Sequence, residues 1–153
     1  MVCPMRYAQA DHAKTGYRKT RDRLSIRRYF DELKLYLVTH PIVESFEMIC
    51  EKIGEKEGYL RVTIGLPDNS VMYCFEYMLS DGSIEISKYS FHRQDMAGNL
   101  ICRWDNAPHH PELDNFPHHI HTKGKVGASS ETNLRKVLSE AKAVLKQQTR
   151  RVE

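Results

Sequence analysis

Alternating apolar and polar positions in the middle of the chain predict β-strands. In residues 59–66 every second residue is Leu, Val or Ile, which is the period of two that a half-buried strand requires. Residues 71–79 repeat this alternation, and residues 84–93 and 100–105 continue it less regularly. Short segments rich in Asp, Asn and Gly separate these runs. We therefore expect consecutive strands joined by short turns, and such strands pair antiparallel.

Residues 42–53 fit two kinds of secondary structure. Their apolar residues lie at helical spacing, but the turn-like sequence GEKEG at residues 54–58 favours a strand that pairs with the one after it. We predict a strand here, which makes the expected sheet an antiparallel meander of about five strands.

Two stretches with a helical period flank the predicted sheet. Apolar residues recur at intervals of three and four over residues 26–37, Ser25 suits the N-cap position, and Pro41 ends the segment. Near the C-terminus, Ser130 suits the N-cap of a second helix that runs to about Gln148. The expected fold class is α+β: an N-terminal helix, the meander, and a C-terminal helix packed on the sheet.

The distribution of charge separates an arm from a domain. Residues 1–28 hold eight basic and two acidic residues, a net charge of +6, whereas the whole chain has +3. We predict that residues 1–24 form a basic, flexible N-terminal arm and that residues 25–150 form a single domain. A basic arm indicates contact with nucleic acid or an acidic partner, or else a tail outside the folded domain.

Composition and motifs exclude several classes of function. The 153 residues contain no apolar run of about eighteen and no N-terminal pattern typical of a signal peptide, so we expect a cytoplasmic protein without membrane contact. The four cysteines are far apart and indicate buried free thiols rather than a zinc knuckle. A Gly-rich phosphate loop, a nucleophile elbow and a dinucleotide fingerprint are all absent from the sequence, which disfavours NTPases, hydrolases of the elbow type and dehydrogenases.

The strongest chemical signal is a group of histidines in residues 100–121. Five of the eight histidines fall within thirteen residues, and each of two adjacent pairs directly follows a proline, Pro108 or Pro117. Imidazole titrates near neutrality and is the commonest metal ligand, while closely spaced prolines exclude a regular strand. We therefore predict a rigid, irregular segment that forms a site. Its histidines are His109, His110, His118, His119 and His121.

Two neighbouring strands are expected to bring further polar groups to this segment. Arg103 and Asp105 share one face of the predicted strand over residues 100–105 and reach its end together. If the turn over residues 94–99 closes a hairpin, His92 lies roughly across from them. Imidazoles, a guanidinium and a carboxylate would then converge at one edge of the sheet.

The histidine segment resembles the signature of the TumE-type toxins of prokaryotic toxin–antitoxin pairs. The resemblance rests on WDNAPHHPE, on FPHHIH shortly after it and on YSFHRQDMAGNLICR before it, and it covers roughly residues 41–126. The basic N-terminus and the residues around His92 depart from the family pattern. The resemblance implies a toxin that arrests growth until a cognate antitoxin, usually a helix-turn-helix protein that binds DNA, neutralises it. Such toxins are generally regarded as ribonucleases, which implies an RNA substrate.

We accordingly expect an endoribonuclease toxin that cleaves RNA by general acid/base catalysis without a cofactor. One imidazole would take the proton of the ribose 2′-hydroxyl, another would protonate the leaving 5′-oxygen, and Arg103 would stabilise the charge on the phosphate. The candidate catalytic residues are His92, Arg103, Asp105, His109, His110, His118, His119 and His121.

Two alternatives use the same residues differently. A divalent metal such as zinc, held by His109, His119 and His121, would make the site that of a metal-dependent nuclease or another nucleotidyl-processing enzyme. Alternatively, the histidines lock a loop or hold a structural metal in a non-catalytic protein that binds nucleic acid. The residues alone leave these alternatives open, and they leave a homodimer open as well.

Overall fold

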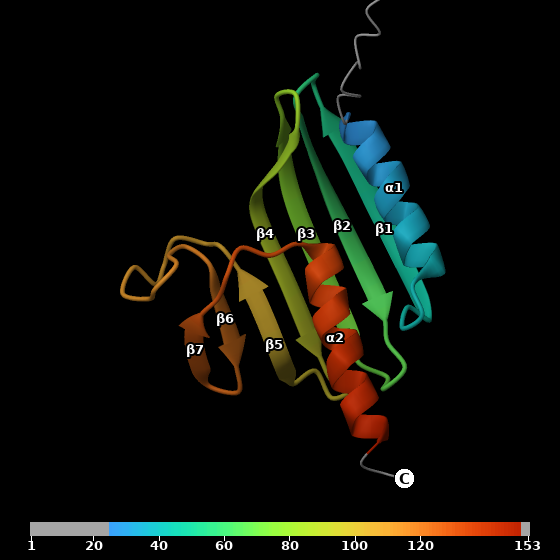
Figure 1. Ribbon diagram of the computed structural model, residues 1–153, viewed down its shortest axis with the longest axis vertical. Coiled ribbons are helices and arrows are strands. Elements are labelled where there is room, and N and C mark those ends of the chain that lie inside the picture. Colours follow the sequence, from blue (N-terminus) through green and yellow to red (C-terminus); the bar gives the residue numbers. More distant parts are fainter. Residues whose placement is uncertain (1–24, 151–153) are drawn as a thin grey trace, which may run out of the picture.

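The computed structural model describes residues 25–150 and has the α+β architecture that the sequence predicts (Figure 1). The predicted basic arm, residues 1–24, lies outside the described residues. One helix precedes seven strands and a second helix follows them. In chain order the elements are α1 (Ile26–Thr39), β1 (Ser45–Ile53), β2 (Glu57–Gly65), β3 (Val71–Ser80), β4 (Ile84–Gln94), β5 (Leu100–Asp105), β6 (His119–Thr122), β7 (Lys125–Ala128) and α2 (Leu134–Thr149).

The strands form one antiparallel sheet whose spatial order follows the chain from β1 to β7. The prediction of a strand within residues 42–53 is confirmed, with pairing from Ser45 onward. The prediction of about five strands is too low, because β6 and β7 are only four residues each and show little periodicity. Gly124 adopts a φ of 77° in the two-residue turn between them, a conformation that glycine tolerates best.

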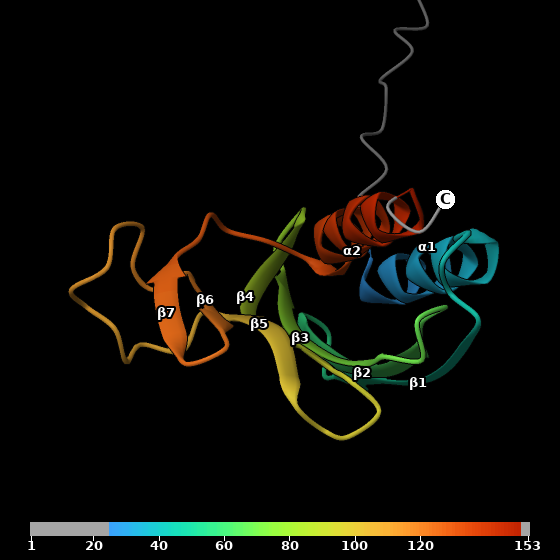
Figure 2. The same ribbon diagram turned by 90° about the horizontal axis from the view of Figure 1, so that it is seen from below.

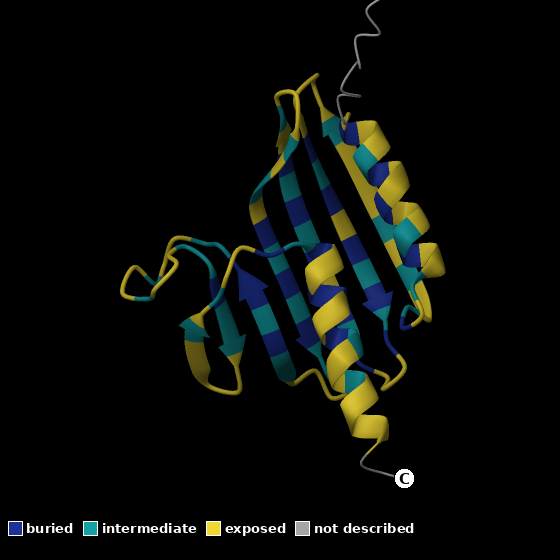
Figure 3. Cartoon of the chain, in the orientation of Figure 1, coloured by how far each residue is buried: buried dark blue, intermediate teal, exposed yellow. Residues whose placement is uncertain are grey.

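Both helices lie on the same face of the sheet, over β1–β4 (Figure 2). Leu60, Val62 and Ile64 of β2 and Met72, Cys74 and Met78 of β3 are buried there. Leu33 and Leu37 of α1 and Leu138 of α2 are fully buried against this core. Figure 3 shows the same division, with buried residues on the inner sides of both helices and in alternate positions along the strands. The predicted packing of the C-terminal helix on the sheet is therefore confirmed.

The first helix begins and ends where its sequence signals lie. The Ser25 hydroxyl accepts a hydrogen bond from the backbone N–H of Arg28, which is the expected N-cap contact. The helix ends at Thr39, two residues before Pro41, because the residue before a proline avoids the helical conformation.

A buried carboxylate contacts the start of α2. Glu76 of β3 is completely buried and accepts hydrogen bonds from the Tyr29 hydroxyl (2.6 Å) and from the backbone N–H of Leu134 (2.8 Å). Burial raises the pKa of Glu76, and these two hydrogen bonds oppose the rise. The helix begins at Leu134 with Asn133 as its N-cap, so the expected cap at Ser130 is three residues too early. The Asn133 side chain caps the helix locally by accepting from the Lys136 N–H, and the contact with Glu76 supports the same position.

The opposite face of the sheet, here called the open face, has no helix over it within residues 25–150 (Figure 2). It carries the side chains that alternate with the core residues, including Arg61 of β2, Tyr73, Phe75 and Tyr77 of β3, and Lys88 of β4. The three aromatic residues of β3 are therefore residues of the sheet surface rather than of the core.

The cysteines follow the prediction of buried free thiols only in part. Trp104, Cys74 and Cys102 are buried, and all three described cysteines are free thiols. Cys50 is exposed, contrary to the prediction of buried thiols, because it lies on β1, the outermost strand of the sheet, where the helix layer covers it incompletely. Neither described helix combines the length and the hydropathy that a membrane span needs.

Replacing Glu76 should destabilise the fold strongly. In Glu76→Ala the Tyr29 hydroxyl and the Leu134 N–H lose their acceptor, and a buried unpaired donor costs about 1–3 kcal/mol. We expect the free energy of unfolding, measured with urea, to fall by roughly 3 kcal/mol. Glu85→Ala, an exposed position on the next strand, is the control and should change it by less than about 0.5 kcal/mol. Equal effects of the two variants would show that the Glu76 hydrogen bonds contribute nothing measurable.

Candidate functional site

The site begins where β5 leaves the sheet. Asn106 follows the last strand residue, and its side chain replaces the backbone pairing at this point: Oδ1 accepts from the Tyr89 N–H, and Nδ2 donates to the Ser87 carbonyl. The Asp105 carboxylate accepts from the Ala107 N–H at 3.1 Å, which turns the chain outward. The loop of residues 107–118 starts from this bend.

The sheet brings the second histidine pair back beside β5. In the β5–β6 register Asp105 lies opposite His119, and Arg103 lies opposite His121. Residues directly opposite each other in an antiparallel pair point to the same face, so these four side chains share the open face. The chain is extended again from His119 onward, where β6 begins.

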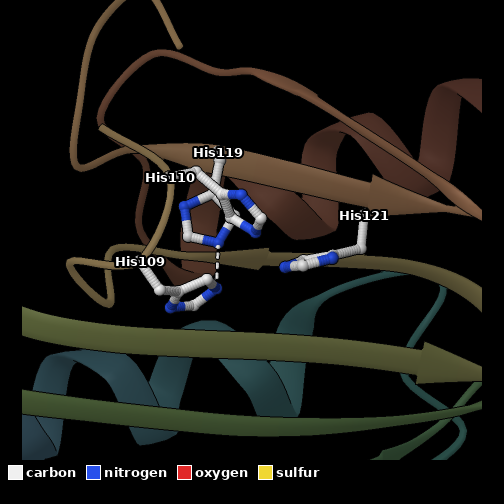
Figure 4. A group of neighbouring side chains, drawn as sticks. All are labelled: His109, His110, His119 and His121. Atoms are coloured by element: carbon white, nitrogen blue, oxygen red, sulfur yellow. Dashed lines mark hydrogen bonds between the residues drawn. The ribbon is translucent and has the colours of Figure 1, made fainter. Parts of the chain in front are cut away.

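The loop places the first histidine pair over the same spot. Figure 4 shows the rings of His109 and His110, from the loop, close to those of His119 and His121, from β6. Each of the four residues offers one nitrogen, and these nitrogens lie within 4.8 Å of one another. The ring centroids of His109 and His119 are 4.6 Å apart. We call these four residues the histidine cluster.

Asp105 is the buried counter-charge of this cluster. Its side chain is 1 % exposed, and its Oδ1 lies 2.9 Å from Nε2 of His119. Its Oδ2 lies 2.9 Å from Nε of Arg103 and 3.6 Å from Nε2 of His121. One carboxylate therefore faces three groups that carry or can carry positive charge. A buried carboxylate needs such partners, because burial without them disfavours its ionised form.

The hydrogen bonds of His119 define its tautomer. Nδ1 lies 2.8 Å from the Pro117 carbonyl, which can only accept, so Nδ1 carries a proton. Nε2 lies 3.1 Å from Nε2 of His109 and forms a hydrogen bond with it, drawn in Figure 4. With Nδ1 protonated, a neutral His119 accepts this hydrogen bond at Nε2 from the Nε2–H of His109, beside the Asp105 carboxylate.

Three buried polar atoms meet without a hydrogen-bond partner at the centre of the site. They are Arg103 Nε, Asp105 Oδ2 and His121 Nε2. Arg103 Nε lies close to Asp105 Oδ2 but not in the direction of a hydrogen bond, and His121 Nε2, at 3.6 Å, is too far from it for one. Buried polar groups are normally paired, and unpaired ones in one place are a common feature of ligand sites.

His121 has an altered acidity. Burial is the largest cause and lowers its pKa, and the positive charges of Arg103, His119 and His110 lower it further. The Asp105 carboxylate acts in the opposite direction and raises it. The net shift is downward, so the neutral ring with a free nitrogen is favoured at neutral pH.

Two candidate residues lie outside the cluster. His118 points away from it: its Nδ1 is 2.8 Å from the Tyr89 hydroxyl, and the two rings stack 5.9 Å apart. His92 lies across the strand pair from Arg103, as predicted, but its nearest ring neighbour is Tyr73 of β3 at 6.4 Å. The geometry therefore brings together Arg103, Asp105 and four of the five clustered histidines.

Several residues of the site were not predicted from the sequence. The Pro117 carbonyl orients His119, and Glu112 binds Nδ1 of His110 at 3.1 Å. The Asn106 side chain, which no sequence pattern marks, pairs with β4. A spacing of two residues between a histidine and a carboxylate or carbonyl was the only available signal, and that signal is weak.

The cluster has the donor set of a metal site as well. Zinc–nitrogen bonds of about 2.0–2.1 Å in a tetrahedron place ligand nitrogens about 3.4 Å apart, and small rotations of the four rings would reach this spacing. Nδ1 of His110 and of His119 already contact oxygen acceptors, which is how proteins commonly orient metal-binding histidines. The residues present therefore fit a divalent metal.

The fold and the site define an α+β protein with a buried carboxylate and a histidine cluster on the open face of an antiparallel meander. The family model described as toxin TumE matches residues 32–149, and the chain belongs to this family. It is therefore a toxin component, and membership of the family points to an antitoxin as its partner. No curated protein and no solved structure matches the chain.

Removing the Asp105 charge should lower the pKa of His121 further. We expect this in the full chain with Asp105→Asn, titrated in EDTA and followed by nitrogen–proton correlation spectra of the imidazoles. His40, at the end of α1, serves as the internal reference and should titrate as in the wild type. An unchanged or raised pKa of His121 would contradict the charge arrangement described here.

Proposed function

We propose that this toxin is an endoribonuclease that cleaves RNA by general acid/base catalysis at the histidine cluster. The observation that supports this best is the difference between two imidazole environments around one buried carboxylate. His121 favours the neutral form, and its Nε2 has no hydrogen-bond partner, whereas His109 and His119 are hydrogen-bonded to each other next to Asp105. Acid/base cleavage needs one imidazole of each kind.

His121 is the proposed general base. Its Nε2 has no hydrogen-bond partner, and its lowered pKa favours the neutral ring, in which one of the two nitrogens is free to accept a proton. It takes the proton of a ribose 2′-hydroxyl while the 2′-oxygen attacks the adjacent phosphorus. Arg103, whose side chain is 43 % exposed, is close enough to bind the phosphate oxygens as negative charge builds on them.

The His109–His119 pair is the proposed general acid. His119 is almost completely buried, whereas His109 is exposed. The proton of their hydrogen bond therefore reaches the substrate through His109. It passes to the 5′-oxygen as the phosphorus–oxygen bond breaks. The products are a 2′,3′-cyclic phosphate and a free 5′-hydroxyl, and the proton taken by His121 balances the one given up by the pair.

Substitution of the proposed base tests this function. We expect His121→Ala to lower the rate of RNA cleavage about 100-fold or more, because a positioned acid or base contributes 10²–10⁴-fold. His40→Asn, a histidine outside the cluster, is the matched control and should keep the wild-type rate. The readouts are growth after induction, the integrity of cellular RNA, and the end groups of the cleaved RNA.

Three outcomes of this experiment bear on the proposal. Loss of cleavage in His121→Ala, with a normal unfolding curve, supports it. Equal toxicity and equal cleavage by a folded His121→Ala variant would refute the assignment of the base. Toxicity without any cleavage of RNA by the wild type would refute the ribonuclease function itself.

A metal-dependent nuclease is the second candidate, favoured by the convergence of four ring nitrogens. A bound divalent metal would activate water or polarise the phosphate, with His109, His110, His119 and His121 as its ligands. The two mechanisms compete for one atom, because Nε2 of His119 cannot both ligate a metal and share a proton with His109. Asp105 would then act by balancing the charge of the site.

Metal analysis separates the two mechanisms. For the metal-free mechanism we expect less than about 0.1 equivalent of bound transition metal after purification without chelator, and unchanged cleavage in EDTA. About one equivalent of metal per chain, together with loss of cleavage in EDTA and its recovery on adding zinc, would instead establish the metal-dependent nuclease.

The proposed partner is a small antitoxin with a helix-turn-helix fold. Co-expression of the protein encoded by the neighbouring reading frame should restore growth, and the two proteins should copurify. The proposed place of action is the cytoplasm, where the RNA substrate is found.

A further inference from the structure

We propose that the open face of β2–β5 binds single-stranded RNA next to the histidine cluster, with bases stacked on aromatic side chains of β3. This inference rests on the proposed ribonuclease function, because it describes how a substrate would reach that same site. It concerns residues outside the cluster. The residues are Arg61, Tyr73, Phe75, Tyr77, Lys88, Ser90 and His92.

The strand register connects these residues to the site in two rows. Phe75 lies opposite Ser90, Ser90 opposite Asp105, and Asp105 opposite His119. The neighbouring row runs from Tyr73 through His92 and Arg103 to His121. Residues in one row share a face, and adjacent strands are about 4.8 Å apart, so Phe75 lies about 10 Å from Asp105 across the sheet.

The surface between Phe75 and the cluster is hollowed. One pocket of about 520 Å³ is lined by Phe75, Ser90, Arg103 and Asp105 among others. A second pocket, of about 240 Å³, is lined by Arg61, Tyr73, Phe75, Ser90 and His92. Phe75 and Ser90 line both pockets, and the small serine leaves room between the aromatic ring and the carboxylate. The two pockets thus border each other, and the larger one reaches Arg103 and Asp105, which contact the histidine cluster.

Cations stand beside the aromatic rings of this face. The Arg61 guanidinium lies 5.3 Å from the centroid of the Phe75 ring, and the Lys88 ammonium lies 5.9 Å from that of Tyr77. Tyr73 is 46 % exposed. Rings that stack with bases, interleaved with cations that meet phosphates, are the usual composition of a surface for single strands.

Charge favours RNA over a protein as the occupant. Arg61, Lys88 and Arg103 surround the pockets. Glu51 of β1 and Glu57 at the start of β2 accept hydrogen bonds from the hydroxyls of Tyr59 and Tyr77. Together with exposed Glu85 near the start of β4, they lie in the rows farther from the cluster, so the positive side chains are the ones nearer to it. A phosphate backbone matches this positive area and would be repelled beyond it.

A probe that cannot be cleaved tests the proposal on the full chain. A fluorescent 2′-O-methyl RNA of about 12 nucleotides lacks the attacking hydroxyl, and its binding can be followed by fluorescence anisotropy. We expect Phe75→Ala to raise Kd about 10- to 100-fold, because stacking of one base accounts for an effect of this size. Phe75→Trp should restore binding. Leu35→Ala, an exposed apolar residue of α1 on the helix side, should leave Kd unchanged.

The salt dependence tests the cationic part. Replacing Arg61 and Lys88 with alanine should weaken binding and reduce the slope of log Kd against log salt by roughly 1.4, the value for two phosphate contacts on a single strand. Lys146→Ala, an exposed lysine in the last turn of α2, is the matched control. An unlabelled duplex should compete poorly with the probe, because its bases are already stacked.

The outcomes separate this inference from the proposed function. Equal binding by wild type, Phe75→Ala and Leu35→Ala overturns the inference, whatever the rate of cleavage of ordinary RNA. So does equal competition by the duplex. If Phe75→Ala weakens the complex with the antitoxin but not binding of the probe, the open face is a protein surface and the inference is wrong. Phe75-dependent binding without any cleavage supports the inference and refutes the ribonuclease function.

Discussion

The site depends on the burial of the Asp105 carboxylate. This group lies at the end of β5 with 1 % of its side chain exposed, and Arg103, His119 and His121 surround it. A buried carboxylate stays ionised only with positive or hydrogen-bonding partners, so its charge and the protonation of the rings are coupled. This one carboxylate thereby gathers a guanidinium and two imidazoles at one place on a small sheet.

Because both helices cover one face of the sheet, the other face is left for the group of side chains around Asp105. Both helices lie on one face, and Glu76 connects the two helices by accepting from Tyr29 of α1 and from the first residue of α2. The core therefore forms without using the open face. An antiparallel sheet can leave one face to solvent, and the unused face is then free to carry polar and aromatic residues over several strands. The histidine cluster lies at the end of that face where β5 and β6 meet the loop.

Much of the fold could be predicted from local patterns. The alternation in β2 and β3 and the stripe of α1 each repeat over several turns or pleats, and the physical period is then clear. The short strands β6 and β7 were not predicted, because four residues are too few to show a period. The start of α2 was predicted three residues too early, because Ser130 suits an N-cap as well as Asn133 does, and Asn133 is the residue that caps the helix.

For the site, the sequence by itself determined the types of residue and the segment that carries them. It also determined that His119 and His121 share a face, because side chains two apart in a strand point the same way. Only the tertiary structure decided that His109 and His110 fold back onto these two, because an irregular loop has no period from which to infer direction. It also placed His118 on Tyr89, outside the cluster, since neighbouring strand residues face opposite sides. Pairing across strands brings Asp105 to His119, and no local sequence pattern encodes that contact.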